Sequence, residues 1–555
     1  MKSCVKRPQM ASQASKPTVT VLDYGAGNVR SVINALELLG CDVDLVRTAK
    51  DVRAAEILVF PGVGCFAAAM DALDQLGVLD ALRDYLRDKD RPFLGICLGL
   101  QLLFASSEES PGREGVGAVD GAVKKLRPPQ NVAIPHMGWN EALATKESPL
   151  FQPRERYYFV HSFAIDTCDP KWAAAVSDYG GQRFTCAVAD GRRAACQFHP
   201  EKSGKQGLAL LRRFVSLARS TQANLGSVVS GSTTLAPRII AALDVRTNDQ
   251  GDLVVTKGDG YDVREKTEGE RAVRNLGKPV DLCARYYDEG ADEICILNIC
   301  AFKGEAAGDL PLLGVLRKAS ERCFVPLTIG GGVRDYTASD GSSVTALDVA
   351  DAYFRAGADK VGIGSDAVKA AKGYYASTSQ KTSIEQIATK YGRQAVVVSL
   401  DPRRVWLADN EDAPSGENGA PAPLVVTHAT ARGPSGESRC WWRATTSGGR
   451  TDEPICAVAV AVAAAALGAG EFMVNCIDCD GKGTGYDIDL LKLVKQSVEV
   501  PVIASSGAGQ PSHFSDVFKG ANVDAALAAG IFHRREVGID EVKAAVRGAG
   551  YPVRD

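Results

Sequence analysis

Residues 91–104 read Arg-Pro-Phe-Leu-Gly-Ile-Cys-Leu-Gly-Leu-Gln-Leu-Leu-Phe, with a single cysteine, Cys97, between Gly95 and Gly99. The apolar run before Cys97 is typical of a buried strand, and the spacing after it is typical of a buried helix. The two glycines permit a sharp strand-to-helix turn, which would expose the thiol at a helix N-terminus, where the helix dipole favours the thiolate. The stretch therefore predicts a nucleophile elbow that carries sulfur; a buried structural cysteine is the alternative.

Length and composition restrict the class of protein. A chain of 555 residues has room for about two to four domains. A composition of 45% apolar and 24% charged residues is typical of a globular protein, and a net charge of −3 gives no support for a nucleic-acid or membrane partner.

The 15 cysteines are not spaced as in a small disulfide-rich domain, so we expect reduced thiols inside the cell. Cys476 and Cys479 form a C-x-x-C without a second pair nearby, and we predict neither a metal nor a cofactor.

The first 17 residues contain Lys2, Lys6, Arg7 and Lys16 and no acidic residue. This composition fits either a basic tail or the remnant of an organelle transit peptide.

From Thr18 onward the apolar pattern alternates between strand and helix. Residues 19–22, 57–60 and 93–96 are predicted to be buried strands, and residues 29–39 and 67–87 are predicted to be amphipathic helices. This order predicts an α/β domain with a parallel sheet.

Two further motifs accompany Cys97. The glycine-rich turn Pro61-Gly-Val-Gly64 follows a predicted strand, and its backbone amides could hold an oxyanion. His199-Pro-Glu201 places an imidazole and a carboxylate two residues apart, on the same side of an extended segment. Glu201 could then orient His199 while His199 serves as base and acid for the thiol of Cys97.

These three motifs together resemble those of the class I glutamine amidotransferases, over residues 18–219. The resemblance implies that Cys97 attacks the glutamine carboxamide and that His199 and Glu201 complete a catalytic triad. It also implies an oxyanion site and a glutamine contact, formed by Gly62, Val63, Gly64, Leu98 and Gln101.

Residues 220–236 are rich in Ser, Thr, Gly and Ala, which is typical of a linker. In residues 237–555, helical patterns separate eight short apolar runs. This arrangement predicts a (β/α)8 TIM barrel whose chemistry lies at the C-terminal ends of the strands. The eight runs are residues 238–245, 293–299, 325–331, 359–365, 394–401, 471–478, 501–507 and 525–532.

The predicted barrel repeats in halves. Ile240-Ala-Ala-Leu-Asp244 is echoed by Val397-Val-Ser-Leu-Asp401, so a twofold repeat would place the two aspartates across the barrel mouth from each other. Glycine-rich segments after the third and fourth strands, and again after the seventh and eighth, would form two anion-sized cups. The pattern predicts acid–base chemistry in the middle of a substrate that has a phosphate at each end.

The second half resembles the cyclase subunit of imidazole glycerol phosphate synthases, and the order of the two halves resembles the fused enzymes of plants and fungi. The resemblance implies the substrate phosphoribulosyl-formimino aminoimidazole carboxamide ribonucleotide (PRFAR), which reacts with ammonia to give imidazole glycerol phosphate and the aminoimidazole carboxamide ribonucleotide AICAR. It assigns acid–base roles to Asp244 and Asp401 and a loop closure to Lys257. The implied phosphate contacts are Gly332, Gly364 and Ser365 for one phosphate, and Asp480, Gly481, Gly507, Ala529 and Gly530 for the other.

The same resemblance implies a route for ammonia between the two sites. Four charged residues at predicted strand starts match a ring at the N-terminal face of the barrel: Arg238, Glu293, Lys360 and Glu471. Asp359 and Lys202 match a pair that bridges the domains and could couple PRFAR binding to glutaminase activation.

Two alternatives remain: a glutaminase fused to another phosphosugar barrel, such as indole glycerol phosphate synthase, and a scaffold without catalysis. We expect a monomer whose partners are glutamine, PRFAR and its own second domain. Several segments are most similar in sequence to plant and algal versions of this enzyme family, which favours the plastid stroma over the cytoplasm. Residues 369–382 and 409–449 are rich in Ser, Gly, Thr and Pro and are predicted to be loops without a chemical role.

Overall fold

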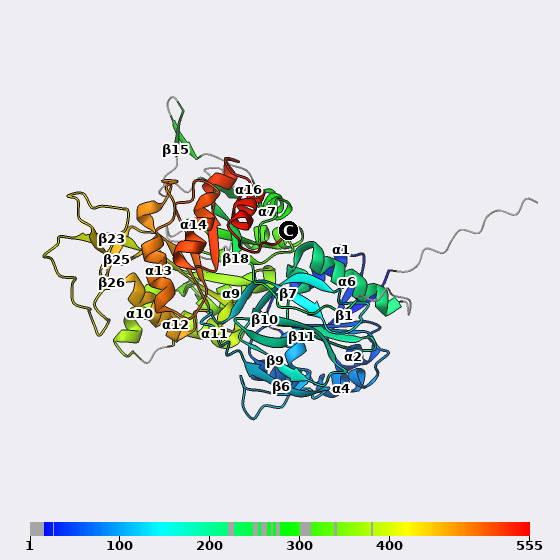
Figure 1. Cartoon of the computed structure of the whole chain (residues 1–555). Coiled ribbons are helices and arrows are strands. Elements are labelled where there is room, and N and C mark those ends of the chain that lie inside the picture. Colours follow the sequence, from blue (N-terminus) through cyan, green and yellow to red (C-terminus); the bar gives the residue numbers. More distant parts are fainter. Residues whose placement is uncertain are drawn as a thin grey trace, which may run out of the picture.

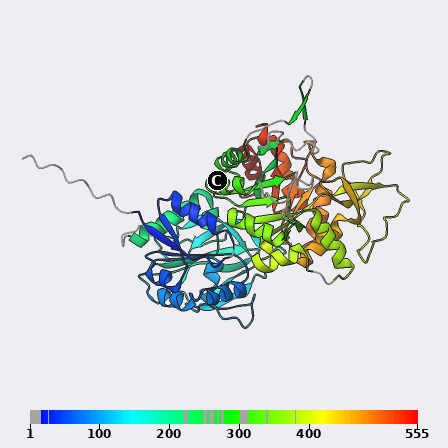
Figure 2. The same ribbon diagram turned by 180° about the vertical axis from the view of Figure 1, so that it is seen from behind.

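The computed structural model describes residues 16–25, 27–219, 227–247, 253–256, 264–267, 270–273, 278–299, 312–337, 341–378 and 381–555. The chain forms two α/β bodies that lie side by side, the first in blue to cyan and the second in green to red (Figure 1). The view from behind shows the same two bodies, with the C-terminus where they meet (Figure 2). None of the described helices is both long enough and apolar enough to span a membrane.

A 12-stranded mixed sheet forms the centre of the first body. Its parallel half has the order β2-β1-β3-β4-β12, and an antiparallel half, β11-β10-β7-β8, continues it. The strands of these halves are β1 (Thr18–Val21), β2 (Asp42–Leu45), β3 (Leu58–Gly62), β4 (Phe93–Cys97), β7 (His136–Ala144), β8 (Arg154–His161), β10 (Ala173–Tyr179), β11 (Gln182–Asp190) and β12 (Arg193–Cys196). Three further strands pair beside them: β5 (Phe104–Ser107), β6 (Val119–Lys125) and β9 (Phe163–Cys168).

The predicted parallel sheet is therefore correct only for the first half of this domain. Strands β3 and β4 are buried along their whole length, which explains their continuous apolar sequence. The single helix predicted over residues 67–87 is wrong, because Gly77 at φ 65° interrupts it between α3 and α4. The helices of this domain are α1 (Val29–Leu38), α2 (Ala49–Ala54), α3 (Phe66–Gln75), α4 (Leu79–Arg87), α5 (Leu98–Gln101), the 3-10 turn η1 (Pro200–Lys202) and α6 (Gly204–Arg219).

The second body is a closed barrel. Its strands follow the order β13-β17-β18-β21-β22-β27-β28-β29, all parallel, and β13 pairs with β29 to close the ring. All eight predicted strands are present, most of them shorter at their ends than predicted. They are β13 (Arg238–Thr247), β17 (Glu293–Asn298), β18 (Leu327–Gly330), β21 (Lys360–Ile363), β22 (Val396–Leu400), β27 (Glu471–Asn475), β28 (Val502–Ser505) and β29 (Ala525–Ala528).

Helices surround this barrel, as expected for alternating strand–helix units. The described ones are α7 (Pro279–Asp288), α8 (Leu312–Ser320), α9 (Ala346–Ala356), α10 (Ser365–Tyr375), α11 (Ser383–Tyr391), the 3-10 turn η2 (Arg393–Ala395), α12 (Ala457–Leu467), η3 (Ile477–Cys479), α13 (Ile488–Ser497), α14 (Ser512–Ala521), α15 (Gly530–His533) and α16 (Ile539–Gly548). Three further pairs of short strands are antiparallel: β14 (Leu253–Thr256) pairs with the barrel strand β13, β15 (Arg264–Thr267) with β16 (Glu270–Val273), and β19 (Tyr336–Thr337) with β20 (Ser343–Val344).

The two segments predicted to be loops contain regular structure. Helix α10 runs into residues 369–382, and the segment 409–449 lies within a four-stranded sheet that projects from the barrel away from the first domain (Figure 1). That sheet consists of β23 (Arg403–Leu407), β24 (Val426–Thr427), β25 (Arg439–Thr446) and β26 (Thr451–Cys456). The prediction failed because Gly- and Ser-rich turns outweighed the strand signal of Cys440-Trp-Trp442, which is buried against the barrel core.

The first domain covers the N-terminal face of the barrel. The indole nitrogen of Trp139 donates to the carbonyl of Asp292, which precedes β17, at 3.0 Å. The amide of Gly204 donates to the carbonyl of Phe324, just before β18, at 2.8 Å. The barrel's C-terminal face, where (β/α)8 enzymes carry their chemistry, therefore lies on the side away from the first domain.

Candidate active sites

Cys97 has the backbone of a nucleophile elbow. It lies between β4 and α5 with φ 54°, a conformation that non-glycine residues rarely adopt. The glycines around it are required by close packing: a Cβ on Gly99 would lie 2.0 Å from the carbonyl oxygen of Phe60, and one on Gly95 would lie 2.8 Å from that of Gly99. The strain is concentrated where the thiol meets the start of the helix.

His199 and Glu201 lie beside this thiol. The Nδ1 atom of His199 is 2.8 Å from Oε1 of Glu201; the backbone of His199 is extended, as expected, but Glu201 lies in the 3-10 turn that follows it. Burial opposes protonation of the ring, but the neighbouring Cys97 and Glu201 outweigh it and raise the pKa of His199 well above its usual value. Nε2 of His199 has no hydrogen-bond partner among the described residues. The carboxylate therefore orients the ring, and the second nitrogen remains available for proton transfer.

The predicted oxyanion turn lies next to Cys97, since Gly62 pairs with Cys97 in the β3–β4 register. The amide of Val63, however, donates to the hydroxyl of Tyr24 at 3.1 Å, and that hydroxyl donates to the carbonyl of Val63 at 2.7 Å. An oxyanion would have to replace Tyr24 at this amide. Tyr24 was not identified from the sequence; the available signal was its position three residues after the end of β1.

Gln101 and Leu98 complete the glutaminase residues expected from the sequence. Leu98 is the first residue of α5, directly after the thiol. The side-chain amide of Gln101 is buried and donates to the carbonyl of Phe163 at 2.9 Å and to Oε1 of Gln197 at 3.1 Å. Gln197 in turn donates from Nε2 to the sulfur of Cys97 at 3.5 Å. Gln197, which the sequence analysis did not identify, therefore connects Gln101 to the thiol.

A cavity of about 1080 Å³ joins this site to the base of the barrel. Cys97, Gln101 and His199 line it from the first domain, and Asp359 and Lys360 line it from the barrel. The glutaminase site therefore opens toward the N-terminal face of the barrel.

The four charged residues predicted at that face form a closed ring. Arg238 pairs with Glu293 at 2.8 Å and also with Glu471, while Lys360 lies 2.6 Å from each of these glutamates. All four side chains are fully buried. Burial opposes ionisation, but Lys360 and Arg238 outweigh it and hold the pKa of Glu293 below its usual value. Two cations and two anions thus balance in charge across the barrel's base.

Lys202 and Asp359 form the predicted bridge between the domains. Nζ of Lys202 lies 2.7 Å from Oδ2 of Asp359, and Lys202 is only 2% exposed. Asn28 of the first domain donates to the other carboxylate oxygen at 2.9 Å. Because Lys202 follows Glu201 and Asp359 precedes Lys360, the bridge connects the triad segment to the charged ring.

Asp244 and Asp401 lie at the C-terminal ends of β13 and β22, on opposite sides of the barrel mouth. Burial of its carboxyl group, with a smaller effect of Asp480, raises the pKa of Asp244 to about 7. Burial also raises the pKa of Asp401, but Asn475 opposes this rise by donating from Nδ2 to Oδ1 of Asp401 at 2.9 Å. Asn475, at the end of β27, was not identified from the sequence.

The predicted phosphate residues gather in two places at the same face. Gly332 follows β18 with φ 82°, and Gly364 and Ser365 join β21 to the start of α10. The amide of Ser447, in the β25–β26 turn, donates to the hydroxyl of Ser365 at 2.9 Å, so the segment predicted to be a loop contacts this cup.

The second cup lies across the barrel from the first. Asp480 and Gly481 follow η3, Gly507 at φ 107° follows β28, and Ala529 and Gly530 begin α15 after β29. Lys257, expected to close over the substrate, lies outside the described residues.

Comparisons with known proteins agree with this two-site arrangement. The family model for class I glutamine amidotransferases matches residues 20–217, and the model for histidine biosynthesis proteins matches residues 238–538. The chain is 51% identical over 539 residues to a protein of Arabidopsis thaliana named imidazole glycerol phosphate synthase hisHF, chloroplastic, covering 96% of this chain and 89% of that protein. The chain belongs to the imidazole glycerol phosphate synthase family.

Separate bacterial and archaeal subunits match its two halves. The HisH subunit of Leptospira borgpetersenii is 41% identical over 36% of this chain, and the HisF subunit of Natronomonas pharaonis is 38% identical over 58% of it; each match covers 99% or more of the subunit. The chain is therefore an enzyme of histidine biosynthesis with a glutamine amidotransferase domain and a cyclase domain. The two alternatives considered from the sequence, another glutaminase–barrel fusion and an inactive scaffold, are not supported.

Proposed function

We propose that Cys97, His199 and Glu201 release ammonia from glutamine. His199 takes the thiol proton as the sulfur attacks the carboxamide carbon, and then donates a proton to the departing nitrogen. Water hydrolyses the resulting thioester to glutamate. The observation that carries this proposal is the strained elbow at Cys97 beside an imidazole whose Nδ1 is held 2.8 Å from a buried carboxylate.

The amide of Val63 is proposed as an oxyanion donor, with the amide of Leu98 as the second. In the structure described here Tyr24 occupies the Val63 amide at 3.1 Å. Glutamine hydrolysis then requires a rearrangement of the Gly62–Gly64 turn, in which the developing oxyanion displaces the tyrosine hydroxyl. A glutaminase that is slow until this turn rearranges would not waste glutamine while the cyclase site is empty.

Ammonia is proposed to pass from the cavity through the ring of Arg238, Glu293, Lys360 and Glu471 into the barrel. In water at neutral pH ammonia is mostly protonated and loses its nucleophilic lone pair, so a shielded route preserves its reactivity. The ring is closed by four ion pairs, and a passage requires that at least one of these pairs opens.

In the barrel we assign Asp244 as the acid and Asp401 as the base of PRFAR cyclisation and cleavage. A carboxyl group with a pKa near 7 is protonated in about half of the molecules at neutral pH, whereas Asp401 accepts a hydrogen bond from Asn475 that favours its ionised form. The two cups would hold the two phosphates of PRFAR, and the aspartates would act between them. The products are imidazole glycerol phosphate and AICAR.

The remaining assignments extend this proposal to the whole chain. The glutaminase domain comprises residues 18–219, a linker residues 220–236 and the cyclase barrel residues 237–555, and the enzyme acts as a monomer. Residues 1–17 would serve as a transit peptide or basic tail, with the plastid as the compartment; a relative named chloroplastic supports this. Fluorescence microscopy of a full-length fusion in plant cells tests the compartment, and light scattering tests the oligomeric state.

A nitrogen-competition experiment tests the function. The full-length enzyme receives PRFAR and glutamine labelled with 15N in its amide, together with an excess of unlabelled ammonium. Label should dominate in the imidazole ring of imidazole glycerol phosphate, with equal amounts of AICAR and glutamate formed. If the ring carried label only in proportion to its share of the total ammonia, the released ammonia would be equilibrating with solvent and the proposed route would be wrong.

A further inference from the structure

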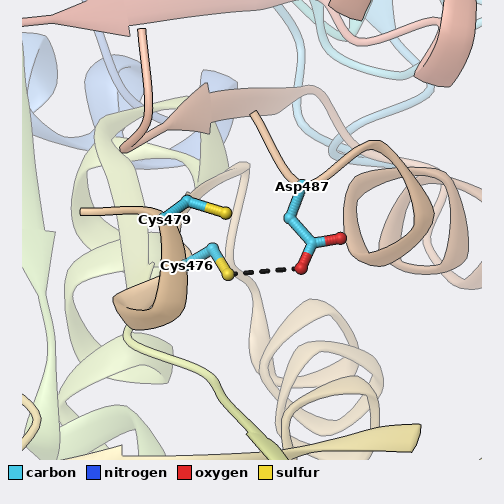
Figure 3. Close-up of side chains that lie close together, drawn as sticks. All are labelled: Cys476, Cys479 and Asp487. Atoms are coloured by element: carbon cyan, nitrogen blue, oxygen red, sulfur yellow. Dashed lines mark hydrogen bonds between the residues drawn. The ribbon is translucent and has the colours of Figure 1, made fainter. Parts of the chain in front are cut away.

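Cys476 and Cys479 lie together at the edge of the cyclase site. They are at either end of the short turn after β27, and their sulfur atoms point to the same side, toward Asp487 (Figure 3). The two sulfurs and a carboxylate oxygen of Asp487 all lie within 4.8 Å of one another. The sequence predicted neither a metal nor a cofactor at this C-x-x-C, and the proposed glutaminase and cyclase chemistry does not use it.

We propose that Cys476 and Cys479 are a reversible thiol–disulfide site, which exchanges with an external disulfide such as oxidised glutathione or an oxidised dithiol protein. The spacing of the pair and the separation of the sulfurs permit an intrachain disulfide after a small rearrangement of the turn, since bonded sulfurs lie about 2.05 Å apart.

The two thiols have unequal environments that suit sequential exchange. Cys479 is half-buried, and its interaction with the neighbouring Cys476 thiol lowers its pKa, so Cys479 is the attacking thiolate. Cys476 is 2% exposed, and the same interaction raises its pKa well above the usual value. Cys476 donates its S–H to Oδ2 of Asp487 at 3.3 Å, and this contact holds its sulfur beside that of Cys479. Cys476 is therefore placed to resolve a mixed disulfide formed at Cys479.

The exchange balances without a further reactant. The Cys479 thiolate attacks one sulfur of the external disulfide, and the other sulfur leaves as a thiolate. Cys476 gives its proton to this released thiolate and attacks the sulfur of Cys479, which forms the intrachain bond and releases the second external thiolate. Two protein thiols are oxidised, and one external disulfide is reduced to two thiols.

A metal site fits these contacts less well. Oδ2 of Asp487 pairs with the guanidinium of Arg404 and accepts from the indole of Trp442 at 3.2 Å. Oδ1 accepts from the amide of Leu490 at 3.1 Å and lies 3.3 Å from Nε2 of His428. A cation at Asp487 would have to displace the cation of Arg404, whereas disulfide formation leaves these contacts in place.

The position of the pair connects its oxidation to substrate binding, and this part of the inference rests on the proposed phosphate cup. Asp480 and Gly481 follow Cys479 directly, and a Cβ on Gly507 of the same cup would lie 3.2 Å from the Cβ of Cys479. Drawing the sulfurs together must move the turn that carries Asp480. Oxidation should therefore weaken PRFAR binding and raise its KM about tenfold, the effect of losing one charge-assisted hydrogen bond to a phosphate.

The test uses the full-length enzyme equilibrated in glutathione buffers of increasing oxidation. Free thiols are then alkylated and the peptide that contains Cys476 and Cys479 is analysed by mass spectrometry. Activity is measured with added ammonium salt, so that oxidation of Cys97 does not affect the rate. We expect the intrachain disulfide to form, KM for PRFAR to rise about tenfold and dithiothreitol to reverse both changes. Cys479→Ser should abolish the response, and Cys168→Ser, at a half-buried cysteine of the first domain, should retain it.

Three results would overturn the inference. The first is full alkylation of both cysteines in every buffer. The second is a disulfide that leaves KM unchanged, while the reduced enzyme still forms imidazole glycerol phosphate. The third is one zinc ion per reduced chain that is lost in Cys479→Ser. A reduced enzyme that makes no imidazole glycerol phosphate from PRFAR and ammonia would instead refute the proposed function, independently of the thiols.

Discussion

Replacing Lys202 with methionine should uncouple the two activities of the enzyme while leaving cyclisation intact. Methionine retains most of the apolar stem of Lys202 and removes only the ammonium group that lies 2.7 Å from Asp359. The variant leaves a carboxylate at the domain boundary without its cation. Asp359 still accepts hydrogen bonds from Asn28 at 2.9 Å and from the amide of Leu327 at 2.8 Å.

The contacts of Asp359 determine how large the loss of coupling in Lys202→Met should be. Removing one partner of a buried ion pair costs about 3–5 kcal/mol, and the lower end applies because two hydrogen bonds to Asp359 remain and its side chain is 18% exposed. If the bridge forms fully only in the activated state, a loss of about 3 kcal/mol would reduce PRFAR activation of the glutaminase about 100-fold. If the bridge also forms in the resting state, PRFAR activation should fall less, because only the difference in bridge energy between the two states affects activation.

Two assays on the same preparation measure the outcome. Glutamate release is followed with and without PRFAR, and cyclisation is followed with PRFAR and ammonium salt. Lys205→Met serves as the matched control, since Lys205 lies on α6 only three residues away and is exposed. We expect the activation ratio to fall in Lys202→Met alone, with ammonia-driven cyclisation unchanged. Equal loss of both activities, or the same effect in Lys205→Met, would refute a coupling role.

Further predictions concern the two sites. Cys97→Ala should abolish glutamine-driven activity and retain ammonia-driven cyclisation, whereas Asp244→Asn should lose both activities. If Asp244→Asn still catalysed cyclisation, Asp244 would be excluded as the acid. Because Asp244 must be protonated and its pKa is about 7, ammonia-driven turnover at constant free ammonia should fall about tenfold between pH 6 and pH 8; a rise would indicate a base. Tyr24→Phe frees the Val63 amide and should increase glutaminase activity without PRFAR, measured as glutamate release. Gly99→Ala places a Cβ 2.0 Å from a backbone oxygen and should unfold the elbow, lowering the thermal midpoint by several degrees.

The fold could be predicted where the signal lies in a short stretch of sequence. It could not be predicted where strands pair with segments that are distant in sequence. The eight barrel strands could be found because each is a short apolar run, and several of them begin at a charged residue, such as Arg238, Glu293 and Glu471. The antiparallel half of the first sheet, which includes β7 and β10, was missed because strand direction depends on partners distant in sequence. The helix break at Gly77 was missed because the apolar spacing continues through it.

The chain's own sequence determined which groups can react. A cysteine between two glycines, a His-Pro-Glu and two aspartates at the ends of repeated strands are local patterns, and their residue types restrict the chemistry wherever the chain places them. Only the tertiary structure decided which partners these groups have. The hydroxyl of Tyr24 on the Val63 amide, the amide of Asn475 on Asp401 and the closed ring of buried charges all join residues that are distant in sequence. Such pairings arise from three-dimensional packing, which no local pattern encodes.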